Sequence, residues 1–477
     1  MKKHISVIIF SMVLLISLFP VGAAANSAQT HWKGTDSAGV VVTDGDCPII
    51  VKNEVLTFNI ENFPKTYYRS EEDFNSYSSS VTAQYTFYNP SEYTVTARLL
   101  FPFGERPMYA YQYYDENAGE YISVDDTAKY EITLNGEPLE KTLRYTLDRG
   151  AFNIDEDVIK IKDGYTDDSF YYPEMPVKCY TFEVSGIDEE EYHAATAAFD
   201  LGEFDGKTKY LLLEQSGRHT QKDGDARISA WVDNKTTLTL FVIGDTTAGY
   251  PEWTLYKNGG VEDKEKIDGT VTLIEEKDLT FSDFVFTHYD ENSMISKFDW
   301  YNALVEQFNY SEDNSGVIFD IGTNLNINGS LLRWYEYEIT LEPNEEAVNC
   351  VSAPLYPEID AGYDPAVFDY IYLLSPAKTW KNFGTLDIKI NTPFYLINSG
   401  NFEFTKTDGR YSLSLERLPE EELSFRLSSG EDPQRPPKKI TDFLPIEIII
   451  MLSVTAGIIL VLILVIVLIR KYKKKHI

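Results

Sequence analysis

The sequence predicts a mainly β protein, made of β-sandwich-like extracellular modules with a few helices and followed by one C-terminal transmembrane helix. Two observations predict the β modules: apolar and polar residues alternate in many short runs, and turn residues separate these runs at roughly eight- to twelve-residue intervals. The third observation is the stretch 448–469, which holds no charged side chain. At about 1.5 Å of helical rise per residue, this stretch crosses a hydrocarbon core about 30 Å thick.

The N-terminus has the features of a secretory signal peptide. Lys2 and Lys3 form a short positive region, an almost wholly apolar run continues to Phe19, and three alanines at 23–25 supply the small residues that cleavage needs. We therefore expect residues 1–25 to be removed. The alternative is that they remain as an uncleaved second anchor. In both cases the following residues, up to the C-terminal helix, face the exterior.

The C-terminal end predicts the orientation in the membrane. Arg470 and four lysines follow the apolar run, and such a basic cluster marks the cytoplasmic side. The sequence LPIEI at 444–448 resembles the sorting signal of wall-anchored proteins, but Glu447 and Ile448 replace the Thr-Gly pair at which sortase cuts. We therefore predict a single-pass protein of the cell membrane with its N-terminal ectodomain outside. The predicted segments are a proline-containing linker at 429–443, the transmembrane helix at 444–469 and a cytoplasmic tail at 470–477.

Residues 26–185 predict an N-terminal β-sandwich-like domain. One alternating run begins at Val81, a turn follows at Asn89-Pro90-Ser91, and a second run continues to Leu99, which predicts a hairpin. Asn135-Gly136 is a pair that closes tight hairpins. The residues expected on one face of the first run are Val81, Ala83, Tyr85 and Phe87.

Residues 186–328 predict a mixed α/β middle region, and residues 329–428 predict a C-terminal β-rich domain with a turn at Asp408-Gly409. An acidic first turn and several alanines predict a helix at 187–200. A second helix is predicted at 295–310, because apolar residues recur there at the spacing of one helical face. The residues of that face are Phe298, Tyr301, Val305 and Phe308.

Charge restricts the partners of the predicted ectodomain. Residues 26–443 contain 35 basic and 74 acidic residues, which gives a net charge near −39. Nucleic acid and anionic lipid are poor ligands for such a chain, because each phosphate contact works against the protein's own potential. Cationic partners, Ca²⁺ and neutral glycans are compatible with it. The alternative is that the acidity only keeps an exported protein soluble.

Residues suited to catalysis are sparse. The predicted mature ectodomain has four histidines, none in the H-E-x-x-H spacing of a zinc site, and the GxSxG motif is absent. Paired carboxylates carry no information in a chain with so many acidic residues. We therefore predict no enzyme activity, no catalytic residues and no cofactor.

The three cysteines, Cys47, Cys179 and Cys350, all fall in the predicted exported part. Because their number is odd, at least one thiol stays unpaired within a monomer. Whether any two of them pair is left open by the sequence. The alternating runs around Cys179 and Cys350 favour a buried role as small apolar residues.

Two kinds of ligand remain as hypotheses. The loop between Tyr109 and Tyr121 is rich in tyrosine, which suits sugar stacking or recognition of a surface protein, although such rings also pack in β-sandwiches. Calcium is the other hypothesis, because carboxylates lie close together at several places, although none matches a complete EF-hand loop. The acidic stretches are Asp44-Gly45-Asp46, Asp155-Glu156-Asp157, Asp223-Gly224-Asp225 and Glu358-Ile359-Asp360.

Two patches of the chain resemble bacterial exported β-rich families of unknown function. The first is an apolar strand with an acidic residue, then VTAQYTFYNP and a strand ending in FPF; the second is YIYLLSPAKTWKNFGTLDIKINTP, with Trp380 and Gly384. The resemblance implies an exported β-rich fold and no known activity. We therefore expect a membrane-anchored binding or scaffolding module at the bacterial cell surface. The alternatives are an accessory or sensor subunit of a membrane complex and, third, an extracellular hydrolase.

Overall fold

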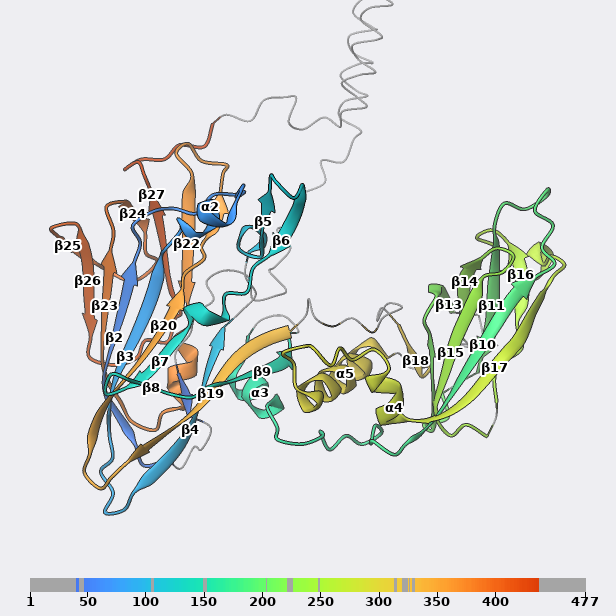
Figure 1. The fold of residues 1–477 in the computed structure, drawn as a ribbon, viewed down its shortest axis with the longest axis horizontal. Coiled ribbons are helices and arrows are strands. Elements are labelled where there is room, and N and C mark those ends of the chain that lie inside the picture. The colour runs from blue at the N-terminus through green and yellow to red at the C-terminus, as the bar shows by residue number, and fades with distance from the viewer. Residues whose placement is uncertain are drawn as a thin grey trace, which may run out of the picture. The chain divides into compact units, whose positions relative to one another are not determined.

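The computed structural model describes residues 40–436, except 43–46, 104–106, 149–151, 203, 221–225, 248, 313–314, 320–324, 326 and 328–330. This part of the chain is mainly β, with several sheets and few helices, as the sequence predicts (Figure 1). None of its helices has the length and apolar character needed to cross a bilayer. The predicted signal peptide, transmembrane helix and cytoplasmic tail lie outside the described residues.

The chain folds into two compact units. The first consists of the residues up to Glu358 together with Tyr370–Pro393 and Ser399–Ser424, and the second consists of Ile359–Asp369, Phe394–Asn398 and the residues from Phe425 onward. The predicted internal boundaries after 185 and 328 remain predictions.

Strands from the N-terminal and the C-terminal parts of the first unit form two sheets, one of eight strands and one of four. In the larger sheet, β2 pairs in parallel with β23, a strand more than three hundred residues later. The buried hydroxyl of Tyr337 on β19 donates to Asn349 Oδ1 on β20 at 3.0 Å, which links the two sheets. The larger sheet has the order β25 (Thr405–Thr407), β26 (Arg410–Leu415), β23 (Phe383–Asn391), β2 (Ile50–Asn59), β3 (Ser80–Tyr88), β20 (Glu346–Pro354), β7 (Glu131–Leu134), β8 (Glu137–Pro138), and the smaller has the order β1 (Val41–Val42), β4 (Val95–Phe103), β19 (Leu331–Leu341), β9 (Thr142–Leu147).

The predicted hairpin of β3 and β4 is wrong, although both strands exist. β3 pairs with β2 and β20, whereas β4 pairs with β1 and β19 in the other sheet. The reason is Asn89, which is fully buried and donates from Nδ2 to the carbonyls of Tyr93, Leu341 and Glu342 at 2.8, 3.1 and 3.1 Å. These bonds hold a connection that carries the chain from one sheet to the other instead of closing a tight turn.

Two predicted hairpin turns are confirmed. Asn135 and Gly136 have φ values of 53° and 84° and join β7 to β8, while Asp408 and Gly409 have φ values of 48° and 78° and join β25 to β26. Positive φ at both central residues is the geometry that Asn-Gly and Asp-Gly pairs favour.

Two further sheets, of five and four strands, enclose a common hydrophobic cluster. Side chains such as Phe182 on β10 and Ile228 on β14 meet there. β17 forms one edge of the larger sheet (Figure 1). The larger sheet has the order β17 (Thr270–Thr280), β10 (Pro176–Ser185), β15 (Thr237–Gly244), β12 (Thr208–Leu212), β18 (Val317–Ile318), and the smaller has the order β13 (Gln215–Thr220), β14 (Ala226–Val232), β11 (Ala195–Leu201), β16 (Thr254–Lys257).

The helix predicted at 187–200 is wrong, because its second half is strand β11. Ala195, Ala197 and Phe199 point into the cluster between the two sheets, a spacing of two residues that suits a strand. The first half of the stretch forms turns, and Asp188 Oδ1 accepts from the backbone N–H of Glu190 at 3.0 Å. Small alanines pack closely on both faces of β11, so their number did not indicate a helix.

The helix predicted at 295–310 is confirmed as α5 (Lys297–Ser311). Ser296 caps it by accepting from the Asp299 backbone N–H at 3.0 Å. Three of the four residues on its predicted face are buried, whereas Phe298 is 40% exposed. The remaining helical segments are α2 (Glu71–Asn75), α3 (Ile154–Asp157), α4 (Phe281–Phe286), η1 (Met108–Ala110), η2 (Thr127–Lys129), η3 (Val158–Lys160), η4 (Asp263–Glu265) and η6 (Ser375–Thr379).

The second unit contains most residues of one four-stranded sheet. The described part of the predicted linker is bound to it: Gln434 exchanges backbone hydrogen bonds with Asp364, at 2.9 and 3.1 Å. Arg435 Nη2 also donates to Asp360 Oδ2 at 2.8 Å. The sheet has the order β21 (Glu358–Asp360), β22 (Val367–Tyr372), β27 (Leu423–Ser428), β24 (Tyr395–Asn398).

Candidate binding surface

The tyrosine-rich loop singled out in the sequence forms a small hairpin of β5 (Gln112–Asp115) and β6 (Glu120–Ser123). Asp115 Oδ1 accepts from the backbone N–H of Asn117 at 2.8 Å in the turn, and Gly119 has the positive φ of 72° that the turn needs. Tyr114 lies directly opposite Tyr121. Because side chains alternate along a strand, these two rings share one face of the hairpin, while Tyr113 and Ile122 share the other.

Tyr67, from an earlier loop, completes a group of three rings that we name the tyrosine patch: Tyr67, Tyr114 and Tyr121. The Tyr67 ring stacks on Tyr114 with centroids 6.3 Å apart and meets Tyr121 edge-on at 6.5 Å. Tyr114 and Tyr121 are 5.2 Å apart in an edge-on arrangement. Tyr67 is 42% exposed and Tyr121 is 56% exposed, so the patch presents aromatic surface to solvent.

A buried aromatic cluster fixes the hairpin from its other face. Phe74 on α2 contacts Tyr68 at 5.2 Å and Tyr113 at 6.5 Å between ring centroids. The backbone adds a bond from the Tyr114 N–H to the Tyr68 carbonyl at 2.9 Å. β5 and α2 therefore lie side by side (Figure 1), and Tyr67 and Tyr68, adjacent in sequence, divide between the patch and the cluster.

A hollow of about 280 Å³, which we name the serine hollow, adjoins the same cluster. The Tyr77 hydroxyl donates to the Leu355 carbonyl at its wall, and Tyr356 contacts both Tyr77 and Tyr109, with centroids 5.9 and 6.4 Å apart. The described residues that line it include one basic side chain and no acidic one: Asn75, Tyr77, Ser78, Ser79, Ser80, Lys129, Ser352, Ala353, Pro354 and Tyr356. The lining thus offers several hydroxyl groups and one side-chain amide on a surface that is otherwise largely apolar.

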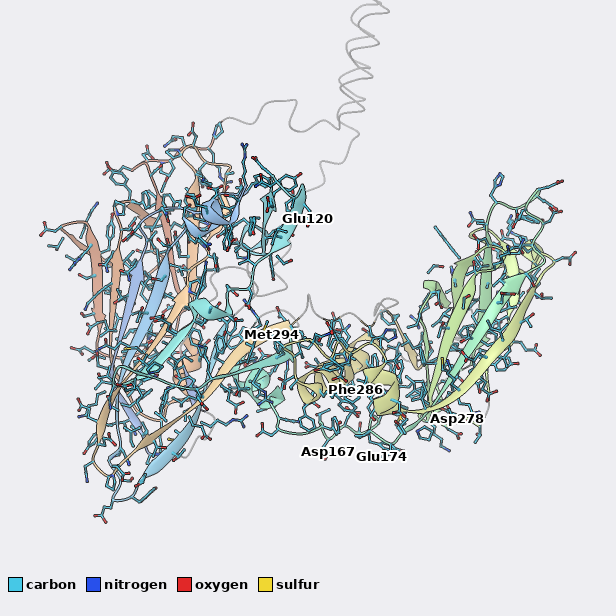
Figure 2. All side chains as sticks on the ribbon, viewed as in Figure 1. Glu120, Asp167, Glu174, Asp278, Phe286 and Met294 are labelled. Carbon is cyan, nitrogen blue, oxygen red and sulfur yellow. The ribbon has the colours of Figure 1, made fainter. Side chains whose placement is uncertain are left out.

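Acidic residues neighbour the tyrosine patch along the hairpin. Asp115 and Glu120 face each other next to Tyr114 and Tyr121, but the alternation of side chains places them on the opposite face from the patch; Glu120 is labelled in Figure 2. Glu116 in the turn lies 3.9 Å from Arg69, in an exposed pair. Partial burial and the neighbouring rings of Tyr121 and Tyr114 raise the pKa of Tyr67 above its usual value of 10. The Tyr67 hydroxyl is therefore uncharged at neutral pH.

The acidic stretches considered for calcium do not come together as a metal site in the described residues, where no group of three or more His, Cys, Asp or Glu side chains could hold an ion. Asp157 instead accepts from the Asn153 backbone and from Lys160, and Asp360 binds Arg435. The stretches 44–46 and 223–225 lie outside the described residues.

The cysteines are placed on or beside strands. Cys179 on β10 and Cys350 on β20 are free thiols. Burial raises the pKa of both thiols above the usual value of 9. Cys47 is buried as well. The buried apolar role predicted for Cys179 and Cys350 is confirmed for Cys179, while Cys350 is half-buried.

The sequence reasoning missed a buried ion network beside α5. Arg144 on β9 donates to Asp299 Oδ1 at 3.0 Å and to Asp163 Oδ1 at 3.1 Å, and Glu336 on β19 accepts from both Arg144 and Arg98. The Asp299 side chain is only 2% exposed and that of Arg144 only 7%. The two arginines lower the pKa of Glu336, although burial opposes them. This network joins β4, β9, β19 and α5.

The sequence reasoning also missed the buried carboxyl of Glu54 on β2. Glu54 is fully buried opposite Tyr85, and burial raises the pKa of its carboxyl to about 8, while the Tyr85 hydroxyl partly opposes this. Neither carboxyl oxygen has a partner at full hydrogen-bond geometry among the described residues. The two-residue alternation of the strand could have indicated this burial, because Glu54 lies on the same face as the buried Leu56 and Phe58.

Comparison with known proteins assigns the chain to no family. No family model matches the chain, and no curated protein does. Among solved structures, one similar chain is a proposed nutrient binding protein from Legionella pneumophila, with 11% sequence identity and a TM-score of 0.33, covering 84% of this chain and 72% of the other. A likeness at this level supports no inference about fold or activity.

Proposed function

We propose that the chain is a non-enzymatic binding module, held at the outer face of a bacterial cell membrane by its C-terminal helix, and that it recognises neutral glycans. The observation that carries the proposal is the tyrosine patch, in which the exposed rings of Tyr67 and Tyr121 and the half-buried ring of Tyr114 are in mutual contact beside a hairpin fixed by a buried cluster. Rigid rings give large contact area at low cost in side-chain entropy.

The chemistry around the patch favours a saccharide without charge. Sugar rings present C–H faces that stack on aromatic rings, and their hydroxyls need donors and acceptors, which the serine hollow supplies. The excess of acidic residues in the chain, with Asp115, Glu116 and Glu120 in the same hairpin, disfavours anionic glycans, because like charges repel.

The test is glycan binding by full-length protein in detergent micelles, on an array of neutral gluco-, manno-, galacto- and N-acetylglucosamine oligomers. We expect one class to bind, and we expect Tyr121→Ala and Tyr67→Ala each to weaken it by about 1–2 kcal/mol, roughly five- to thirtyfold. Tyr93→Ala is the matched control, because Tyr93 is 61% exposed and lies outside the patch. It should bind like the unchanged protein.

Two results would refute the proposal. One is the absence of binding to every neutral oligomer. The other is binding that all three tyrosine variants retain equally, which would place the glycan elsewhere. Binding only to basic proteins would assign the patch to a protein partner instead.

A further inference from the structure

A second hollow, separate from the tyrosine patch, is lined by residues of β9, α3, η3 and α5. Its volume is about 260 Å³. Because one water molecule accounts for about 30 Å³ of liquid, the hollow has room for a ligand the size of an amino acid or dipeptide. Its described lining is Tyr145, Thr146, Leu147, Glu156, Ile159, Lys160, Lys162, Thr166, Asp168, Asn302, Ala303, Val305, Glu306 and Asn309.

Asparagines of α5 hold the loop that forms one wall of the hollow. The Thr166 backbone N–H donates to Asn302 Oδ1 at 2.7 Å, and Asn302 Nδ2 donates to the Gly164 carbonyl at 2.9 Å. About two helical turns further on, Asn309 Nδ2 donates to Asp168 Oδ2 at 2.8 Å. The wall is therefore preformed on a fifteen-residue helix, which lowers the cost of ordering the site when a ligand binds.

The buried ion network supports the same wall from beneath. Arg144 Nη2 donates to the backbone carbonyl of Lys162 at 2.6 Å, and Asp299 Oδ2 accepts from the Tyr145 backbone N–H at 3.1 Å. The backbone at Lys162 is thereby fixed while its side chain stays exposed. A cation on a fixed backbone at a rim is well placed to meet a ligand.

Most charges of the lining are satisfied within the protein. Lys160 lies between Asp157 and Glu306, at 2.7 and 3.0 Å. Asp168 accepts from the backbone N–H groups of Phe170 and Tyr171, each at 2.8 Å, and with the bond from Asn309 these lower its pKa, although burial opposes them. These groups form the frame and leave little capacity for a charged ligand.

Two charges of opposite sign remain. Lys162 is exposed and donates to the neutral Thr166 Oγ1 at 3.0 Å, and Glu156 is exposed on α3. Within the described part of the chain, neither takes part in an ion pair. A single cation and a single anion on one hollow match a ligand that carries both charges.

We propose that this hollow binds a small zwitterion, either a free α-amino acid or a short peptide. The ligand carboxylate would bind the Lys162 ammonium and the ligand ammonium would bind the Glu156 carboxylate. Both ligand groups are charged at neutral pH. In a chain with 75 acidic and 42 basic residues, Lys162 is the group that makes a carboxylate acceptable here. The proposal is independent of glycan binding, because none of its residues belongs to the tyrosine patch or the serine hollow.

The experiment is calorimetric titration of full-length protein in detergent micelles with glycylglycine and with its blocked form, N-acetyl-glycylglycinamide. We expect saturable binding of the first and none of the second. Lys162→Gln and Glu156→Gln should each weaken binding about tenfold or more, since each removes a hydrogen bond to a charged group. Asp167→Asn is the matched control, because Asp167, labelled in Figure 2, is exposed in the same loop and does not line the hollow.

A further ligand separates the two halves of the site. N-acetylglycylglycine keeps its carboxylate and lacks the ammonium, so it should bind the unchanged protein and Glu156→Gln equally and should lose affinity in Lys162→Gln. Thermal unfolding of each variant confirms that its fold is intact. The proposal is overturned if glycylglycine, glycine and L-alanine all fail to bind at millimolar concentration, if the blocked dipeptide binds equally well, or if the three variants behave alike.

Discussion

Replacing Glu54 with Gln should change how the stability of the large sheet depends on pH. Burial raises the pKa of Glu54 from 4.5 to about 8, whereas the unfolded chain keeps the ordinary value. As the pH rises above 4.5, the unfolded state loses its proton while the folded state keeps it. The contribution of Glu54 to stability is therefore fully present below pH 4.5 and is lost as the pH rises to about 8.

The expected size of this effect is large. Between 4.5 and about 8 lie about 3.5 pH units, and at about 1.4 kcal/mol per unit the loss approaches about 5 kcal/mol. Whole domains are stable by only about 5–15 kcal/mol. Tyr85 and Tyr372, whose charges would couple to Glu54, do not titrate in this window, because burial raises the pKa of each well above 10.

Amide hydrogen exchange of peptides from β2 and β3 is the assay, because it reports the opening of this sheet separately from the rest of the chain. The unchanged ectodomain and Glu54→Gln are compared at each pH, so that intrinsic exchange rates and other titrating groups cancel. Near pH 5 the two should differ little, and near pH 8 Glu54→Gln should be better protected. A difference in protection that stays constant from pH 5 to pH 8 would refute the reasoning.

Three other predictions concern packing, charge and anchoring. Gly384→Ala should destabilise the ectodomain by about 2 kcal/mol or more in urea unfolding, because the added Cβ would lie 2.0 Å from the Lys52 carbonyl oxygen; Gly164→Ala, with open space around it, should cost less than about 1 kcal/mol. Asp299→Asn should cost about 3 kcal/mol, since it leaves Arg144 buried with less compensation, whereas Asp163→Asn, at an exposed carboxylate, should cost under about 1 kcal/mol. A chain ending at residue 443 should be found in the culture medium, while the full-length protein should resist carbonate extraction from membranes.

Local patterns predicted what depends on neighbouring residues. The Asn135-Gly136 and Asp408-Gly409 turns follow from the φ values those residues tolerate, and α5 follows from the spacing of Tyr301, Val305 and Phe308. The strand run beginning at Val81 was predicted with its buried face, since period two is a property of one strand. None of these features depends on which distant segment packs against it.

Strand partners depend on distant segments, and there the sequence reasoning failed. The sequence predicts a hairpin of β3 and β4 because they are adjacent and joined by a turn motif. They are separated by Asn89, whose side-chain amide donates to the carbonyls of Leu341 and Glu342, about 250 residues later. No local pattern carries that information. The parallel pair of β2 and β23 is hidden for the same reason.

The candidate binding surface also has one part that local sequence predicts and one part that depends on distant packing. The loop that contains Tyr114 and Tyr121 was found from its density of tyrosine, and the alternation of β5 and β6 then decides which rings share a face. Tyr67 could not be found, because the contacts that bring that earlier loop to the hairpin, such as the packing of Tyr68 against Phe74 and the bond from the Tyr114 N–H to the Tyr68 carbonyl, are tertiary. Because the patch is assembled from two loops over one buried cluster, we expect Phe74→Ala to weaken glycan binding. Phe74 is 3% exposed, so the substitution removes a buried ring that does not itself contact the glycan. If Phe74→Ala bound glycan as tightly as the unchanged protein, the two loops would be held in place by something other than this cluster.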